Sequence, residues 1–359
     1  MVYTILAVVF SACSGSDESI RESRPVEILV STGFGSASGV ETRVAGSIGK
    51  ERIFSNGPLH LSVVRIDQIS ESDASYLPYT ERNEHGQGQA PRSGCLEGYN
   101  SDIRMKFDTE EYYLLRSQNN NTKLIGWYPQ VDNEINGSSW LVDNGVATVN
   151  FTVDGQTDIL MSNLVEGNVD HPYKEESNKL IFKHLLTRFR VCIYTTDANV
   201  PAVWGGVTGV SLVGKSQVCR VQLPSVESPS NTYPTDIIFD GNSNLPLIPK
   251  DPVDNSPILG YDNPDNALPI PVVDGYVEGD DIGFAGYAMV APEADALFLI
   301  VQTKYRTSLP IKIEAPLVDG FAAGSSYTIA LSVNANAVVP AGVTITDWDF
   351  QNEGEGIIN

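Results

Sequence analysis

The sequence predicts an all-β protein built from β-sandwiches. Charged residues make up only 19% of the chain, and 31 Gly and 21 Pro supply many turn formers, a composition that favours short strands joined by turns. Short apolar runs with alternating positions recur along the sequence, as strands with one buried face require. The 359 residues suit two domains or one large β domain, and two successive sets of strands favour two sandwiches.

The charge of the chain limits its partners. The formal net charge is −22 and the sequence pI is about 4.4. A strongly anionic protein is repelled by nucleic acid and by anionic membrane surfaces. We therefore expect no nucleic-acid partner.

The N-terminus is typical of an exported protein. Residues 1–12, MVYTILAVVFSA, form an apolar run that is shorter than the roughly 20 residues of a membrane span and fits a signal peptide. Phe10-Ser11-Ala12-Cys13 is similar to a bacterial lipobox, and the polar residues 13–25 suit a tether. The prediction is a lipid on Cys13; the alternative is an ordinary signal peptide followed by an incidental cysteine.

The next segment combines a short strand with an accessible basic residue. Val26, Ile28 and Val30 alternate along the expected first strand, 26–30, and a Gly/Ser-rich stretch then leads to Glu41-Thr42-Arg43-Val44. Such a stretch is open to proteases, so the bond between Arg43 and Val44 is the expected cut. Arg52 is a poorer site because Glu51 precedes it. In the alternative interpretation, Arg43 is a surface residue of an uncut chain.

The first half of the chain contains a regular series of strand patterns. A polar region near 169–178 places the domain boundary after 174, which gives domains 26–174 and 175–359, and the polar, Gly-rich stretch 67–101 is expected to be a long loop. Asp143-Asn144-Gly145 predicts a hairpin turn. The expected strands are 59–66, 103–107, 111–115, 123–128, 140–142, 146–153 and 157–163.

The second half opens with its most regular pattern, 180–196, whose alternation shifts phase near Leu186-Thr187. Residues 225–281 contain eleven Asp or Glu, nine Pro and one basic residue, Lys250. Proline fixes φ and removes a hydrogen-bond donor, so we expect an extended insertion with no core strand beyond 237–239. Strands 207–213 and 217–223 are expected to pair around Gly214. The remaining expected strands are 296–303, 309–313, 327–334 and 343–350.

Signals for catalysis and metal binding are weak. The four histidines have no metal-ligand spacing, and the chain contains no GxSxG or Walker motif; we expect no enzyme, cofactor or metal site. Asp132, Glu134 and Asn136-Gly137 are similar to part of a calcium loop, but the residues fit an ordinary Asn-Gly turn better. Buried thiols or a disulfide between Cys192 and Cys219 both fit the sequence.

Four short motifs, in order, resemble a known family. They are the lipobox with its acidic tether, Thr42-Arg43 after the first strand, Asp158-Ile159-Leu160-Met161 followed by Leu180–Leu186, and Tyr327-Thr328-Ile329 followed by Ile345-Thr346-Asp347-Trp348. Together they span nearly the whole chain. In these features the sequence resembles the fimbrillin-like proteins of Bacteroidales, which are subunits of the type V pilus.

The resemblance implies a fold and a mode of assembly. Fimbrillins have two transthyretin-like β-sandwich domains, reach the outer membrane and cell surface as lipoproteins, and are trimmed by a trypsin-like or arginine-specific protease. Loss of the first strand, here Val26, Ile28 and Val30, opens a groove that the terminal strand of another subunit fills. The matching donor residues are Val343, Ile345 and Trp348. Partners would be other pilus subunits and the processing protease.

Two other functions remain open from the sequence. A surface glycan-binding lipoprotein is also built from β-sandwiches, and Trp127, Trp140 and Trp204 would be its aromatic platforms if they were exposed. A glycan hydrolase would need two carboxylates that face each other across a cleft.

Overall fold

The computed structural model describes residues 25–34, 59–70, 73–79, 91–99, 102–113, 120–131, 138–248, 267–275, 282–316 and 320–347. Predictions for the signal peptide 1–12, Cys13, Arg43, Val44, Arg52, the calcium-like run 132–137 and Trp348 lie outside these residues. No helix in the described ranges is long and apolar enough to cross a membrane.

The first and largest sheet contains strands from both halves of the chain. Its order is β10-β6-β9-β11-β1-β5-β4-β2-β3, and β6 also pairs with β2, so that seven of these strands form a closed ring. The strands are β1 (Val30–Phe34), β2 (Leu59–Ser70), β3 (Asp73–Tyr76), β4 (Arg92–Tyr99), β5 (Asp102–Phe107), β6 (Thr122–Tyr128), β9 (Leu160–Ser162), β10 (Val165–Gly167) and β11 (Leu180–His184).

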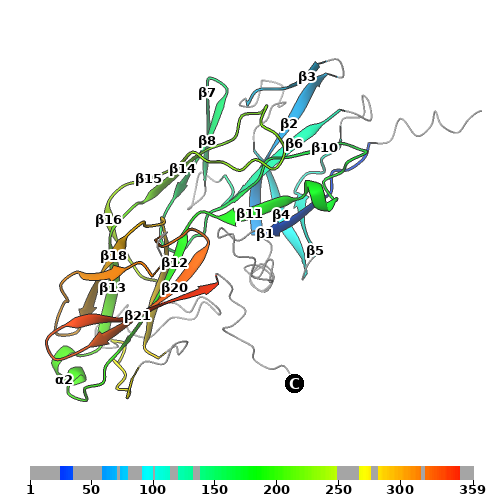
Figure 1. Ribbon diagram of the computed structural model, residues 1–359. Helices are drawn as coiled ribbons and strands as arrows, with labels where there is room; N and C mark the ends of the chain where they lie inside the picture. The colour runs from blue at the N-terminus through cyan, green and yellow to red at the C-terminus, as the bar shows by residue number, and fades with distance from the viewer. Residues whose placement is uncertain are drawn as a thin grey trace, which may run out of the picture.

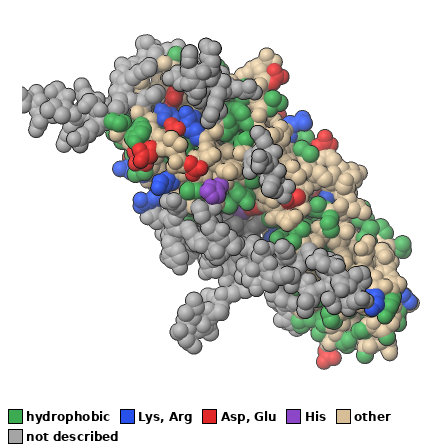
Figure 2. Space-filling view, turned by 180° about the vertical axis from the view of Figure 1, so that it is seen from behind, with side chains coloured by type: hydrophobic (Ala, Val, Ile, Leu, Met, Phe, Trp, Pro, Cys, Tyr) green, Lys and Arg blue, Asp and Glu red, His purple; other side chains and the backbone are tan. Residues whose placement is uncertain are grey.

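Three four-stranded sheets complete the fold, in the orders β17-β12-β20-β21, β16-β13-β18-β19 and β15-β14-β8-β7. In Figure 1 the first sheet lies at one end of an elongated molecule and the sheets that contain β13 and β20 lie at the other. Figure 2 shows the same elongated shape from behind. Their elements are β7 (Ser139–Asp143), β8 (Val146–Thr152), η2 (Glu176–Asn178), β12 (Thr187–Tyr194), α2 (Val200–Trp204), β13 (Val207–Lys215), β14 (Val218–Gln222), β15 (Ile237–Asp240), β16 (Ser243–Pro246), β17 (Phe284–Val290), β18 (Ala296–Thr303), β19 (Ile311–Glu314), β20 (Ser325–Val333) and β21 (Val338–Asp347).

Strand alternation divides the buried side chains among three cores. Val63 and Leu124 lie in the core that also contains Val30, whereas their neighbours Val64 and Ile125 lie in a second core with residues of β8 and β14. Successive residues of a strand point to opposite faces, so β2 and β6 contribute to both cores. The third core is formed by strands of the second half.

The all-β prediction is confirmed, and several strands match closely. β18 covers the expected 296–303, and β7 and β8 form the expected hairpin. Its turn residues Asn144 and Gly145 have φ of 50° and 79°. Positive φ at both central residues is the signature of the turn that suits a two-residue hairpin.

The expected long loop at 67–101 is wrong. β2 continues to Ser70, and β3 and β4 both fall inside this range. The sequence of β4, RSGCLEGY, has few branched residues, so it lacks the usual strand signal. Its position between β2 and β5 supplies hydrogen-bond partners on both sides, and tertiary pairing outweighs the local preference.

Two further predictions, one of a single long strand and one of a strand pair, are also wrong. The run 180–196 is two strands, because β11 joins the first sheet whereas β12 pairs with β17 and β20. Likewise β13 and β14 do not pair around Gly214: β13 lies between β16 and β18, and β14 between β15 and β8. A sequence pattern predicts a strand but contains no information about which distant strand satisfies its hydrogen bonds.

Strand pairing crosses the expected domain boundary at 174. β11 belongs to the first sheet, and β14 pairs with β8 through registers such as Val221 with Val149. The two halves are therefore joined by hydrogen bonds as well as by the chain. The division into domains 26–174 and 175–359 stays a prediction.

The insertion 225–281 contains the strand expected near 237–239, β15. The expectation of no other core contribution is wrong, because β16 pairs with β13, and Leu245, Leu247 and Ile270 join the core of the second half. β16 is an edge strand, where a proline such as Pro246 is tolerated.

Candidate strand-exchange site

The first strand lies in the middle of the first sheet. β1 pairs with β11 in parallel, with Thr32 opposite Leu180, and with β5 in antiparallel, with Val30 opposite Met105. Figure 1 shows β1 in dark blue beside β11 and β5. Because both of its edges are hydrogen-bonded, removal of β1 would uncover two strand edges at once.

The residues before β1 rest on a short ledge formed by 111–113. The Ile28 amide donates to the Glu111 carbonyl at 2.7 Å, and the Tyr113 amide donates to the Val26 carbonyl at 2.9 Å. The expected strand at 111–115 is thus a single bridge, Glu27 with Tyr112, in its described part. These two hydrogen bonds hold residues 26–28 against the ledge just before the chain enters the slot, which is the space between β5 and β11 that β1 occupies.

The inward alternation of this segment begins at Ile28 and does not include Val26. Ile28 and Val30 are 3% and 1% exposed, whereas Val26 is 41% exposed. The Thr32 hydroxyl also faces inward and donates to the Ile103 carbonyl at 3.1 Å. Burial of an aliphatic side chain contributes about 1.5–3 kcal/mol, so Ile28 and Val30 are the main apolar anchors of the segment.

The strand begins later than its sequence pattern indicates. Residues 26–30 were the expected strand, yet the ladder runs from Val30 to Phe34. The assignment of 31–34 to a Gly/Ser-rich loop is wrong because β5 and β11 supply partners on both sides.

A buried ion-pair network supports the ledge. Arg65 Nε lies 2.8 Å from Asp67 Oδ1, and Arg65 Nη1 lies 2.8 Å from Glu111 Oε2. The Arg65 side chain is only 6% exposed. Burial acts to lower the pKa of Arg65, but the attraction and hydrogen bonds of Asp67 and Glu111 outweigh it and raise that pKa. The guanidinium therefore stays charged and fixes Glu111.

A stacked tyrosine pair connects the ledge to the segment between β10 and β11. Tyr113 and Tyr173 stack at 5.8 Å, and the Tyr173 amide donates to the Tyr113 hydroxyl at 3.0 Å. Burial raises the pKa of Tyr113 to about 12. The Ser31 amide donates to the Tyr173 carbonyl at 3.1 Å, so β1 contacts the loop that carries Tyr173.

Replacing Tyr173 with Phe tests this support. The Tyr173 hydroxyl donates to the Thr122 carbonyl at 2.6 Å inside the core. Its loss leaves a buried acceptor with one partner fewer, so the free energy of unfolding should fall by about 1–3 kcal/mol. Chemical denaturation measures the change. Tyr305→Phe, at a residue that is 61% exposed, is the control and should differ little from the wild type; equal effects would contradict the assigned role.

The expected donor residues lie at the other end of the chain. β21 pairs with β20 alone and is an edge strand, with Val343 opposite Ile329 and Ile345 opposite Tyr327. Val343 packs against the core of the second half, whereas Ile345 is 41% exposed. Release of β21 from its sheet would therefore break the hydrogen bonds along one edge, the edge shared with β20.

One histidine and two cysteines, His184, Cys192 and Cys219, are buried within the fold. His184 is buried and its Nδ1 contacts Asp158 Oδ2. Cys192 in β12 and Cys219 in β14 lie in different sheets and are buried without a disulfide between them. Burial raises the pKa of the Cys219 thiol to about 12. Among the described side chains, no group of three or more His, Cys, Asp or Glu is placed to hold a metal ion.

The three tryptophans do not form exposed platforms. Trp127 is fully buried and Trp204 is 3% exposed, and Trp140 is partly buried and stacks on Trp127 at 5.7 Å. Trp127 donates through Nε1 to Ser138 Oγ at 2.8 Å. The prediction that these rings serve a glycan platform is therefore not supported by their positions.

Sequence reasoning found Val26, Ile28 and Val30 but not the residues that surround them. Arg65, Glu111 and Tyr173 come from three distant segments and share no motif. A charged residue inside an apolar strand pattern, as in LHLSVVRI, was the one available signal, because a buried charge requires a partner.

Among known proteins, this chain is similar to solved structures. No protein-family model matches the sequence, and the search of curated proteins finds no match. A solved structure from Bacteroides uniformis, named as a proposed cell adhesion protein, is 12% identical with a TM-score of 0.49 and covers 90% of this chain and 98% of its own. A similarly named protein from Bacteroides ovatus is 14% identical with a TM-score of 0.46, over 90% and 98% of the two chains.

The fimbrial anchor protein Mfa2 from Porphyromonas gingivalis is 10% identical, with a TM-score of 0.37 over 90% of this chain and 98% of its own. The chain thus resembles, over nine-tenths of its length, solved Bacteroidales proteins that are named for cell adhesion and for fimbriae.

Proposed function

We propose that this chain is a structural or adhesive subunit of a surface pilus. It is exported as a lipoprotein through Cys13, trimmed by a trypsin-like protease after Arg43, and polymerised by donor-strand exchange at the outer cell surface. In this proposal the two halves act as transthyretin-like acceptor and donor domains. The observation that carries the proposal is the central position of β1, which precedes the Arg43 segment and has a neighbour at each edge.

Excision of the first strand would create a site for another strand. β5 and β11 would each present unpaired backbone groups, and the space left by Ile28 and Val30 would be an apolar slot. A strand that fills it satisfies both needs, as in β-augmentation. Since β1 is parallel to β11 and antiparallel to β5, a strand that restores this pattern must run in the same direction as β1.

The C-terminal strand is the proposed donor. Val343 and Ile345 are two residues apart and share one face of a strand, as do Ile28 and Val30. Trp348, three residues beyond Ile345, would face the other side of a regular strand. Burial of four or five large side chains in all would contribute on the order of 10 kcal/mol before ordering costs, enough for a stable polymer of this chain or related subunits.

Brief trypsin treatment of the full-length precursor tests the proposal. We expect the first cut after Arg43, a new N-terminus at Val44, and filaments that electron microscopy and gel filtration detect. The Arg43→Ala precursor should stay monomeric under the same treatment, and Arg52→Ala, the matched control, should behave as the wild type. A first cut elsewhere, or filaments from Arg43→Ala, would show that the proposed trimming is wrong.

A further inference from the structure

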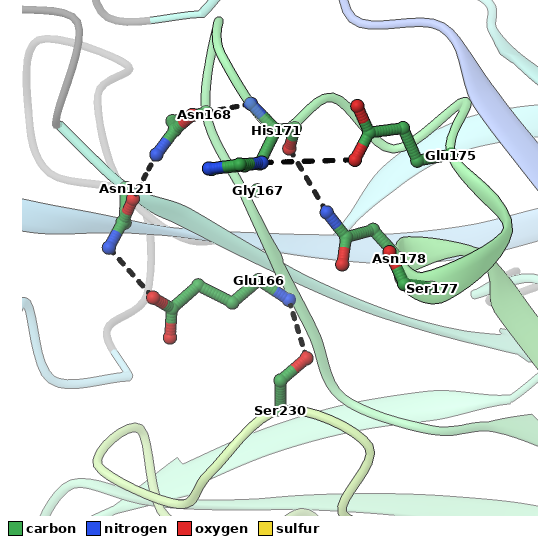
Figure 3. Close-up of a pocket in the computed structure, with 9 residues that line it drawn as sticks. All are labelled: Asn121, Glu166, Gly167, Asn168, His171, Glu175, Ser177, Asn178 and Ser230. Carbon is green, nitrogen blue, oxygen red and sulfur yellow. Dashed lines mark hydrogen bonds and ion pairs between the residues drawn. The ribbon is translucent and has the colours of Figure 1, made fainter.

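A polar pocket lies at one edge of the first sheet, where β10 ends. Its volume is about 330 Å³, at the lower end of the range for small-molecule sites. Figure 3 shows its side chains converging from the start of β6, from β10 and the loop after it, and from the segment that holds Ser230. The lining residues are Asn121, Glu166, Gly167, Asn168, His171, Glu175, Ser177, Asn178 and Ser230.

We propose that this pocket binds a neutral, hydroxyl-rich ligand, namely a saccharide. Ligand pockets are usually lined by apolar side chains with a few polar groups, whereas all the described side chains that line this one are polar. The lining alternates carboxylate acceptors with amide and hydroxyl groups that both donate and accept. Such a mixed set matches sugar hydroxyls, which also donate and accept.

The polar groups are held in place before any ligand arrives. Asn121 Nδ2 donates to Glu166 Oε1 at 2.7 Å, and Asn168 Nδ2 donates to Asn121 Oδ1 at 2.7 Å. The His171 amide donates to Asn168 Oδ1 at 2.7 Å, and Asn178 Nδ2 donates to the His171 carbonyl at 3.1 Å. The chain of dashed bonds in Figure 3 therefore orients the lining, which lowers the ordering cost of binding.

The charges of the pocket favour a neutral ligand. Two carboxylates, Glu166 and Glu175, oppose an anion such as a phosphate or an acidic sugar. Lys123 Nζ lies 3.7 Å from Glu166 Oε2 and offsets the negative charge of Glu166. The amide oxygens of Asn121 and Asn168 each accept a hydrogen bond within the lining, so one of the two lone pairs of each oxygen is already used.

The backbone at Gly167 is closely packed. A Cβ at Gly167 would lie 3.0 Å from both the His171 carbonyl oxygen and the Tyr173 ring, which is tighter than ordinary packing. Tyr173 is fully buried and fixes the loop from below. His171 Nδ1 lies 3.9 Å from Glu175 Oε2, and these two side chains are 73% and 43% exposed, so they can contact a ligand without supporting the core.

The test uses the uncut precursor, so its result is independent of polymerisation. Saturation-transfer NMR and calorimetry would be run with methyl glycosides of glucose, galactose, mannose and N-acetylglucosamine and with their β-linked disaccharides. We expect at least one neutral saccharide to bind, and His171→Ala/Glu175→Ala to weaken it at least tenfold. Lys312→Ala/Glu314→Ala removes another exposed ion pair, 2.6 Å across, and should leave the affinity unchanged.

Three outcomes would overturn the proposal. They are the absence of binding by every neutral saccharide in the panel, unchanged binding by the His171→Ala/Glu175→Ala variant, and stronger binding of Ca²⁺ or of galacturonate than of any neutral sugar. Circular dichroism of the double variant confirms that it is folded, and Asn178→Ala gives a second variant at the same site. Filament formation would be unaffected by any of these results.

Discussion

Replacing Ile28 and Val30 together with Ala is expected to lower the free energy of unfolding of the uncut chain by about 4–7 kcal/mol. An Ile→Ala change in a core typically costs 2–5 kcal/mol, because apolar contacts are lost and a cavity remains, and loss of two Val methyl groups adds about 2 kcal/mol. Whole domains are stable by only about 5–15 kcal/mol. The variant should therefore be partly unfolded at 37 °C.

Guanidinium titration followed by tryptophan fluorescence measures this effect. The matched control is Val26→Ala/Leu29→Ala, which changes two residues of the same segment that are 41% and 48% exposed and should alter stability by less than about 0.5 kcal/mol. The two single core variants share a core and need not add. If the core and control pairs proved equal, Ile28 and Val30 would not be the anchors of the first strand.

Replacing Arg65 with Ala should lower the free energy of unfolding by about 3–5 kcal/mol. The substitution leaves the Asp67 carboxylate without Arg65 and leaves Glu111 paired with Arg92, and removal of one partner of a buried ion pair has an effect of this size. Because the Glu111 carbonyl holds the Ile28 amide, local opening should begin at residues 26–30. Hydrogen exchange at Ile28 should therefore quicken more than exchange in β18.

Arg220→Ala is the control for this change. Arg220 is exposed on β14 and contacts Asn150 Oδ1 at 3.2 Å, so its loss should be nearly neutral. A second variant, Arg65→Met, keeps much of the side-chain volume and separates the loss of charge from the loss of packing. Stability of Arg65→Ala within 1 kcal/mol of the wild type would mean that the network does not support the ledge.

Sequence patterns predicted those strands whose two faces differ. β8 alternates between buried and partly exposed residues, and this period of two is visible in VATVNFT without any knowledge of its partners. β4 could not be predicted in the same way, because its strand character comes from β2 and β5 on either side. The pattern of a strand is local, whereas its pairing depends on segments far away in the sequence.

In the candidate site, too, local patterns could be predicted from the sequence and long-range pairings could not. The alternation of Val26, Ile28 and Val30 predicts three side chains on one face; Ile28 and Val30 are buried, whereas Val26 is 41% exposed. The central place of β1 between β5 and β11 depends on pairings with distant segments, which local patterns cannot predict. Ser31 pairs with Arg104, 73 residues away, and Thr32 pairs with Leu180, 148 residues away. The saccharide pocket was missed because its lining comes from separate segments without a shared motif.

The pairing of β8 with β14 has a mechanical meaning. Tension on the chain between its two halves passes through the covalent link at Leu185-Leu186, which joins β11 to β12, and also through the lateral hydrogen bonds between Phe151 and Cys219 and their neighbours. These two routes share the load, so the halves cannot swing apart by rotation about the link alone. In a filament exposed to flow, such a subunit would behave as a stiff rod whose joint yields only when a whole ladder of bonds ruptures together.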